Sequence, residues 1–348
     1  MESRITAWQS ALEQAAEHAR TYVTSGHLPT ALVALATSTE RIGTRACNET
    51  GEEATDLYDR RFALASITKA ITGTGMACLA DEGKLDYTKP VAEYIPEFGA
   101  DEQRKRITVG DVFTHTTGLP SKFAPTMADG GCSSEVCRRW LLEDQLQSEP
   151  GTEMAYTSYT YQILNWLVER LTGGTMSSFL EEHVYGPCGM TGTSFHPGPE
   201  GGRVPTVDHP VKDAEHMEQF CKLEVSGGGL WSTAPDLLSL GQALLQPGKL
   251  LRPETFRLVT ATRSTAPRRD TGEPSARTWG WVKEEQPAFP CQPESGFYHG
   301  GATGTLLYLD PPRDLLFVFL SSRWGSGNDH AFATLNVVYE ALGLEGGS

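Results

Sequence analysis

The stretch Phe62-Ala63-Leu64-Ala65-Ser66-Ile67-Thr68-Lys69, continuing as AITGTGMACLADEG to Gly83, is typical of a buried helix and its entry. Residues 66–82 are mostly small or apolar, and Gly83 supplies a C-terminal stop. A helix that is apolar on most sides runs through a protein interior. We therefore expect Ser66 at the N-terminus of an interior helix, with Lys69 one turn later on the same face.

This placement gives the S-x-x-K spacing of Ser66 and Lys69 a chemical meaning. A serine hydroxyl is a poor nucleophile until a neighbour takes its proton, and Lys69 is placed to do so or to tune the group that does. The helix N-terminus also stabilises negative charge that develops at the serine. Taken alone, the motif is better interpreted as an ordinary N-cap serine with a surface lysine.

Two further patterns carry reactive or polar groups. Tyr156-Thr157-Ser158 precedes a predicted helix at Tyr161–Leu171, and a tyrosine there can shuttle a proton if positive charge lies nearby. The alternative is an aromatic packing cluster. In Tyr298-His299-Gly300-Gly301-Ala302, glycines beside an edge strand let a substrate approach backbone N–H groups that can bind an oxyanion. The alternative is a glycine-rich turn with an incidental histidine.

In this order, the three patterns resemble the class C β-lactamase and penicillin-binding family of serine hydrolases, including its esterase and transacylase branches. The blocks ITVGDVFTHTTGLP, VSGGGLWSTAPDLLSLG and HGGATGTLLYLDP extend the resemblance over roughly residues 30–340. It implies an α+β fold, with a β-lactamase-like antiparallel sheet flanked by helices and a mainly helical second region. It also implies site roles: catalysis by Ser66, Lys69 and Tyr156, an oxyanion hole from the N–H groups of Ser66 and Ala302, and substrate binding by Ser158, His299, Gly300 and Gly301.

The chain departs from the family pattern twice. The usual Tyr-x-Asn is Tyr156-Thr157-Ser158, so a hydroxyl replaces an amide. The lysine of Lys-Thr-Gly is His299, a mostly neutral and switchable group in place of a permanent charge. Both changes fit ester cleavage and acyl transfer better than a grip on an anionic β-lactam or cell-wall peptide. Whether Lys69 or Tyr156 is the general base stays open.

The order of the elements before and after residues 62–83 predicts one sheet with strands from both ends of the chain. A helix at 2–26 precedes a strand at Ala31–Ala36 and its hairpin partner at Arg41–Ala46. Three late strands and a final helix are expected at Trp279–Val282, Thr303–Leu309, Leu315–Leu320 and 328–342. We expect a discontinuous sheet domain (1–87 and 225–348), a mainly helical domain (88–224), and the active site between them.

Composition excludes several partners. A formal net charge of −15 argues against nucleic acid and anionic membranes. With no membrane-length apolar run and no signal peptide, a cytoplasmic protein is expected. Metal-ligand spacing is lacking, so no metal or cofactor is implied. The expected partner is a small-molecule ester or acyl donor, and sequence leaves the oligomeric state undetermined.

Two residue types need a separate interpretation. The seven cysteines are scattered and odd in number, which favours free, mostly buried thiols, with a Cys132–Cys137 bridge as the minor alternative. His115 has no G-x-S-x-G serine to serve, so a structural histidine bonding a turn is favoured over a triad member.

The leading functional hypothesis is a serine hydrolase that cleaves a small ester through a Ser66 acyl-enzyme. Three alternatives stay open: a biosynthetic transacylase that passes the acyl group to an amine or alcohol, a β-lactamase or D-amino-acid peptidase, and an inactive ligand-binding relative.

Overall fold

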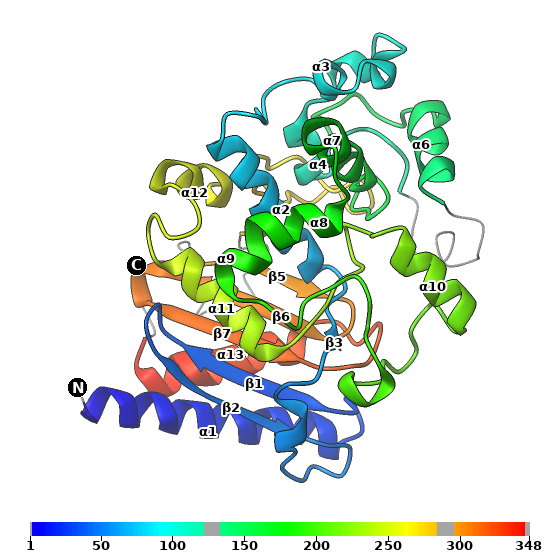
Figure 1. Cartoon of the computed structure of the whole chain (residues 1–348). Helices are drawn as coiled ribbons and strands as arrows, with labels where there is room; N and C mark the ends of the chain where they lie inside the picture. Colours follow the sequence, from blue (N-terminus) through cyan, green and yellow to red (C-terminus); the bar gives the residue numbers. More distant parts are fainter. Residues whose placement is uncertain (1, 122–132, 284–295, 345–348) are drawn as a thin grey trace.

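One antiparallel sheet holds strands from both ends of the chain (Figure 1). The computed structural model describes residues 2–121, 133–283 and 296–344. The strand order is β2-β1-β7-β6-β5, so the N-terminal hairpin pairs directly with the C-terminal strands, with Leu32 opposite Leu320. The strands are β1 (Ala31–Ala36), β2 (Arg41–Cys47), β5 (Phe297–Gly301), β6 (Thr305–Asp310) and β7 (Leu315–Leu320).

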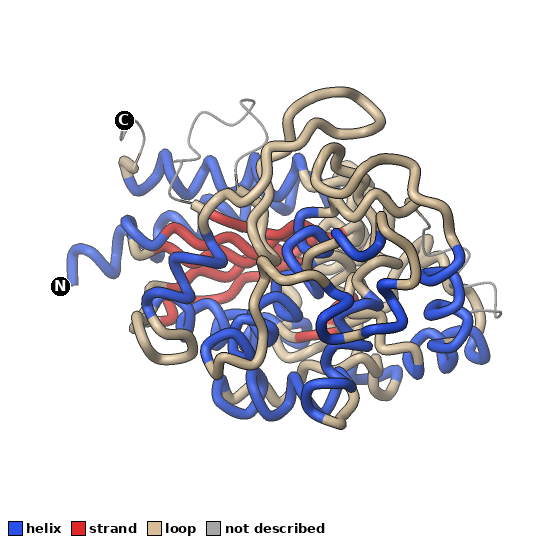
Figure 2. The backbone as a smooth tube through the Cα atoms, turned by 90° about the horizontal axis from the view of Figure 1, so that it is seen from above, coloured by secondary structure: helices blue, strands red, loops and turns tan. Residues whose placement is uncertain are grey.

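Helices bury both faces of this sheet, which is why β1, β6 and β7 are buried at every position. Helices α1 (Glu2–Thr24) and α13 (Asp329–Leu342) cover one face, where Val33 and Leu35 join their core. Leu32 and Ala34 point to the other face, toward α2 (Ile67–Asp81) and α11 (Ala234–Leu245). Figure 2 shows the strands between these layers. The predicted α+β arrangement of an antiparallel sheet flanked by helices is confirmed.

The middle of the chain is mainly helical, as predicted. Its helices are α3 (Val91–Tyr94), α4 (Val109–Thr114), α6 (Ser134–Glu143), α7 (Gln162–Thr172), α8 (Met176–Leu180), α9 (Gly186–Cys188) and α10 (Ala214–Lys222), with a π-helical turn at Glu181–Tyr185. Helix α12 (Pro253–Thr260) follows α11. Strands β3 (Phe62–Ala63) and β4 (Trp231–Ser232) form a separate two-stranded ladder. The division into two domains at 88 and 224 stays a prediction.

The strand expected at Trp279–Val282 is wrong. The backbone bends there, because Gly280 has a φ of +107° and packs against the backbone of Gly73 in α2. The two tryptophans that suggested a strand anchor the bend instead. Trp279 stacks on Tyr87 with ring centroids 4.1 Å apart, and Trp281 packs edge-on against Phe297.

The cysteines and the helices of the described residues bear on two further expectations. Cys47, Cys78, Cys188 and Cys221 are free thiols, as predicted, whereas the alternative bridge from Cys132 lies outside the described residues. Within the described ranges, no helix combines the length and the apolar character that crossing a membrane requires.

Candidate active site

Ser66 lies where the chain enters α2, and the local backbone is unusual. Ala65 directly before it has a φ of +45°, a conformation that costs a non-glycine residue about 1 kcal/mol or more. Ser66 occupies the N-cap position, yet its side chain makes no capping hydrogen bond. The serine is partly exposed, while Ile67 after it is fully buried. The hydroxyl is therefore directed at a reachable surface instead of stabilising its own helix.

Lys69 lies on the same face of α2 and is completely buried. Its Nζ is 3.4 Å from Ser66 Oγ, and it donates to Ser158 Oγ at 2.9 Å and to the Gly227 carbonyl at 2.5 Å. Burial lowers the pKa of the Lys69 ammonium, although nearby Tyr156 opposes that shift. The Ser158 hydroxyl and the Gly227 carbonyl thus hold Lys69 Nζ from one side, while the side chains of Ser66 and Tyr156 also bond to it.

Tyr156, the third predicted catalytic residue, lies beside Ser66 and Lys69. Lys69 Nζ lies 4.6 Å from the centre of its ring, and its hydroxyl is hydrogen-bonded to the Ser66 side chain. Burial alone would raise the pKa of Tyr156, but the positive charges of Lys69 and Arg277 and the Ser66 hydrogen bond outweigh it, so that pKa is lowered. A hydroxyl, an amine and an acidified phenol therefore share one hydrogen-bonded cluster.

His115 supports this cluster without joining it. It ends α4 in a left-handed conformation, with a φ of +59°, and its Nδ1 accepts a hydrogen bond from the Thr157 N–H at 3.4 Å. Its ring packs against Tyr156, with centroids 4.5 Å apart. The predicted bond between His115 and the backbone is observed, although its partner Thr157 lies in a segment without regular structure and not in a turn.

The turn that carries Ala302 runs directly beside the entry to α2. A Cβ on Gly301 would lie 2.2 Å from the Leu64 carbonyl oxygen, so only glycine fits there. The Thr303 hydroxyl donates to the Ala63 carbonyl at 2.6 Å. These contacts bring the backbone of Ala302 next to that of Ser66, and both residues are partly exposed. Two backbone N–H groups in this position can bind an oxyanion.

A second layer, from α13, holds this turn in place. Asn328 precedes α13 but makes no cap, because its Nδ2 donates to the carbonyls of Gly301 (3.1 Å) and Thr305 (2.8 Å). The Gly304 carbonyl is bonded to His330 Nε2 at 3.0 Å. Sequence suggested nothing about Asn328 beyond a helix start, because an N-cap asparagine normally accepts a hydrogen bond from its own helix.

The predicted substrate contact His299 is buried beside the cluster. Its Nδ1 bonds to the Gly300 carbonyl at 2.9 Å. Burial and the charge of Lys69 lower the pKa of His299 to about 3, so the ring is neutral at physiological pH. The switch in charge expected from the sequence is therefore not available. Its neighbour Gly300 is partly exposed and fits the predicted substrate side of the strand.

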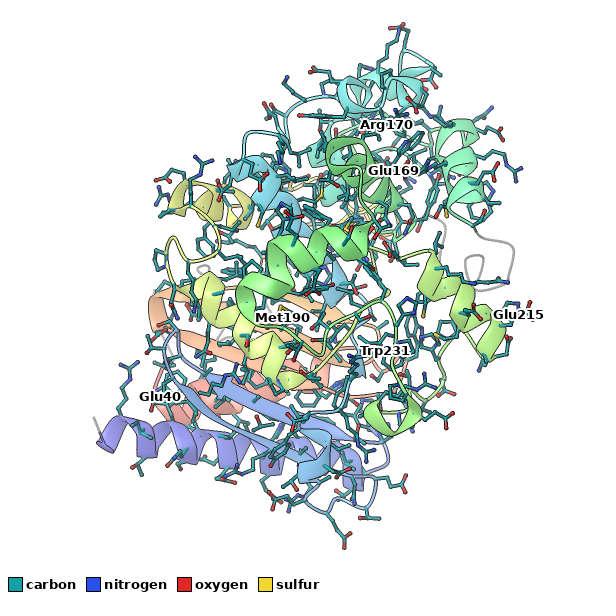
Figure 3. The ribbon with its side chains drawn as sticks, viewed as in Figure 1. Glu40, Glu169, Arg170, Met190, Glu215 and Trp231 are labelled. Atoms are coloured by element: carbon teal, nitrogen blue, oxygen red, sulfur yellow. The ribbon has the colours of Figure 1, made fainter. Side chains whose placement is uncertain are left out.

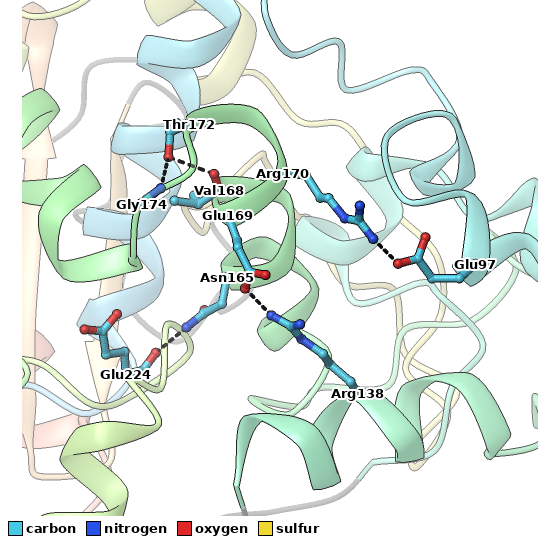
Figure 4. Close-up of polar contacts among 9 residues, drawn as sticks. All are labelled: Glu97, Arg138, Asn165, Val168, Glu169, Arg170, Thr172, Gly174 and Glu224. Carbon is cyan, nitrogen blue, oxygen red and sulfur yellow. Dashed lines mark hydrogen bonds and ion pairs between the residues drawn. The ribbon is translucent and has the colours of Figure 1, made fainter.

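Sequence reasoning missed two groups that act on Lys69 and Tyr156. The first is the Gly227 carbonyl, which comes from the segment after α10. That segment is anchored by Asn165 of α7, whose Nδ2 donates to the Glu224 carbonyl at 2.8 Å (Figure 4). Figure 4 also shows α7 tied to its neighbours by ion pairs of Arg138 with Glu169 and of Arg170 with Glu97.

The second missed group is Arg277, a buried guanidinium whose carbon lies 5.5 Å from the centre of the Tyr156 ring. No motif marks either group. The block VSGGGLW contains Gly227, but only the fold shows which of its carbonyls meets Lys69.

Comparisons with known proteins place the chain in a family. A family model described as Beta-lactamase matches residues 15–341. The chain is 28% identical to Protein Rv1367c of Mycobacterium tuberculosis, over 75% of this chain and 77% of that protein. It is 29% identical to an N-acetylmuramyl-L-alanine amidase of Bacillus subtilis, over 75% of this chain and 68% of that protein.

Among solved structures, "EstCE1, a hydrolase with promiscuous acyltransferase activity" superposes with a TM-score of 0.80 at 21% identity, covering 96% of this chain and all of the other. This likeness concerns the fold. The family match over residues 15–341 establishes that the chain belongs to the beta-lactamase family of serine hydrolases.

Proposed function

We propose that this protein cleaves small-molecule carboxylic esters through an acyl-enzyme on Ser66. The observation that carries the proposal is the convergence of Ser66 Oγ, Lys69 Nζ and the Tyr156 hydroxyl in one hydrogen-bonded cluster. Burial lowers the pKa of the Lys69 ammonium, and the charge of Lys69 lowers the pKa of Tyr156, so both shifts favour the deprotonated form that accepts a proton.

The chemistry proceeds in two balanced steps. Ser66 Oγ attacks the ester carbonyl and its proton passes to the Lys69–Tyr156 pair, while the N–H groups of Ser66 and Ala302 bind the oxyanion. The bond to the leaving alkoxide then breaks, and the pair returns the proton to that oxygen. Water attacks the acyl-enzyme in the same way and releases the acid and free Ser66.

Two features favour an ester over an anionic β-lactam. His299 is neutral where the family pattern has a lysine, so this position offers no charge to a substrate carboxylate. Ser158 replaces the family's asparagine, yet it retains the contact with Lys69. Both replacements leave the groups needed for acylation in place, but they weaken the binding of an anionic substrate. Transfer of the acyl group to an amine or alcohol uses the same acyl-enzyme, and the similarity to EstCE1 supports it as a variant.

A peptidase acting on D-amino-acid substrates is a second candidate, because Arg277 keeps a buried positive charge near Tyr156. A relative named "Putative D-alanyl-D-alanine carboxypeptidase", from Escherichia coli and 26% identical, supports this alternative as well.

Hydrolysis of p-nitrophenyl acetate separates these functions. We expect a burst of nitrophenol, an acetyl adduct on the protein and steady turnover, with a second product when a primary amine is added. Faster cleavage of a D-Ala-D-Ala peptide or a chromogenic cephalosporin than of the ester would favour the second candidate. No burst, no adduct and no turnover of any of them would favour the inactive relative.

The pH profile of ester cleavage is predicted to depend on Arg277. Its charge lowers the pKa of both Tyr156 and Lys69, so Arg277→Gln should raise both. Activity that requires a deprotonated base then appears at higher pH, whichever of the two groups serves. The measurement is kcat/KM as a function of pH. The ascending limb of this profile should shift to higher pH for Arg277→Gln and stay at the wild-type pH for Arg277→Lys. An unmoved limb in the glutamine variant would show that this charge does not tune the base.

A further inference from the structure

A cavity of about 730 Å³ lies beside β4, between α10 and the segments at 196–213. Its floor is apolar and buried, and is formed by Val211, Cys221 and Trp231. On α10, Ala214, Met217 and Cys221 recur every three or four residues, so one face of that helix forms a wall. Charged side chains stand at the exposed rim: Glu200, Lys212, Asp213 and Glu218.

His209 and Trp231 line the inner side of this cavity, and Trp324 packs against the His209 ring. The centroid of the His209 ring lies 5.3 Å from that of Trp324 and 6.5 Å from that of Trp231. His209 Nδ1 accepts a hydrogen bond from the Val211 N–H at 3.0 Å, and burial lowers the pKa of this histidine. The ring is therefore neutral and presents a flat surface. Figure 3 shows Trp231 on the side of the molecule where α10 stands, with Glu215 on the outer surface of that helix.

Backbone hydrogen bonds connect the walls of the cavity to both oxyanion residues. The Leu64 N–H, two residues before Ser66, donates to the carbonyl of Leu230 at 2.9 Å, and Trp231 follows directly.

The second connection runs through Trp324. Its N–H donates to the Val207 carbonyl at 2.9 Å, and the Gly325 N–H donates to the Ala302 carbonyl at 2.6 Å. Segments that line the cavity are thus hydrogen-bonded to segments within a few residues of Ser66 and Ala302.

From this arrangement we infer that the cavity receives the acyl group of the substrate, and that the preferred acyl group is uncharged and either aromatic or of medium chain length. The inference rests on the proposed ester cleavage. With the carbonyl carbon at Ser66 Oγ and its oxygen between two N–H groups, the leaving oxygen must face Tyr156 to receive a proton. The acyl chain then extends away from Tyr156, toward the segments that carry Trp231 and Trp324. An apolar floor stabilises a buried methylene chain there.

The test compares p-nitrophenyl hexanoate with p-nitrophenyl acetate. Burial of extra methylenes should give wild type a kcat/KM at least about tenfold higher for the hexanoate. Met217→Lys places a charge on the cavity wall and should lower the ratio of hexanoate to acetate about tenfold. Gln219→Lys adds the same charge to α10 away from the cavity and should leave the ratio unchanged.

The outcomes separate this inference from the proposed function. Equal kcat/KM for the two esters, or a ratio that Met217→Lys and Gln219→Lys leave alike, would overturn the acyl pocket while ester cleavage stands. A preference for a charged acyl group, such as a p-nitrophenyl hemisuccinate, would also overturn it. Failure to cleave any of these esters would overturn the proposed function itself.

Discussion

Ser66→Ala is expected to abolish ester turnover, lowering kcat/KM by about 10⁴-fold or more, because the Ser66 hydroxyl is bonded to both Lys69 and Tyr156. The Ser158 hydroxyl also contacts Lys69, but it donates to the buried Gly227 carbonyl and should not replace Ser66. The fold should tolerate the change. The Ser66 side chain makes no capping hydrogen bond, so its loss should cost less than about 1 kcal/mol of unfolding free energy. Turnover of a chromogenic ester and thermal unfolding measure the two effects.

Ser133→Ala is the matched control, since its effects should be the reverse. Ser133 caps α6 by accepting the Val136 N–H at 3.2 Å, so removing its hydroxyl should cost about 1 kcal/mol of stability and leave turnover intact. If Ser66→Ala stays active, Ser66 is not the nucleophile. If Ser66→Ala unfolds, the Ser66 hydroxyl has a structural role that its observed contacts do not explain.

Tyr156→Phe should lower kcat/KM by about 10²–10⁴-fold, which is the usual contribution of a positioned acid or base. The substitution deletes the phenolic oxygen bonded to Ser66 but keeps the ring that packs against His115. Little change in the melting temperature is therefore expected. Steady-state kinetics on an ester with a poor leaving group gives the sharpest measurement, because departure of an alkoxide depends most on the returned proton.

Tyr159→Phe provides the comparison for this change. Tyr159 is also buried, but its hydroxyl donates to Asp144 at 2.8 Å, away from Ser66. Its loss should affect stability and leave kcat/KM within about twofold of wild type. Equal losses of activity in the two phenylalanine variants would indicate a general packing effect and count against a proton-transfer role for Tyr156.

Short sequence patterns predicted the helices and strands whose residues are set by burial, and the S-x-x-K pair within one of those helices. The apolar run after Ser66 could only be an interior helix, and S-x-x-K spacing places Lys69 beside Ser66 on any helix. The strands at 31–36 and 315–320 were recognisable because both their faces are buried. A sheet built from both ends of the chain was expected from the order of elements, and the observed pairing of these two strands agrees with it.

Groups supplied by tertiary contacts could not be predicted in this way. The Gly227 carbonyl meets Lys69 only because α7 and α10 fix the segment between them, and a carbonyl has no signature in sequence. Arg277 follows a stretch without regular structure, so nothing in its spacing indicates Tyr156. The bend at Trp279–Val282 was misinterpreted for a related reason. Aromatic residues favour strands, but here the approach of Gly280 to Gly73 decides the backbone.

Covalent labelling tests the central claim most directly. A fluorophosphonate should react with the Ser66 hydroxyl, lose fluoride and add one phosphonyl group to the intact protein. Trypsin cleaves after Arg61 and Lys69, so the added mass should appear on the peptide covering residues 62–69 and be absent from Ser66→Ala. Wild-type protein that stays unmodified, or that carries the label on another peptide, would contradict the account.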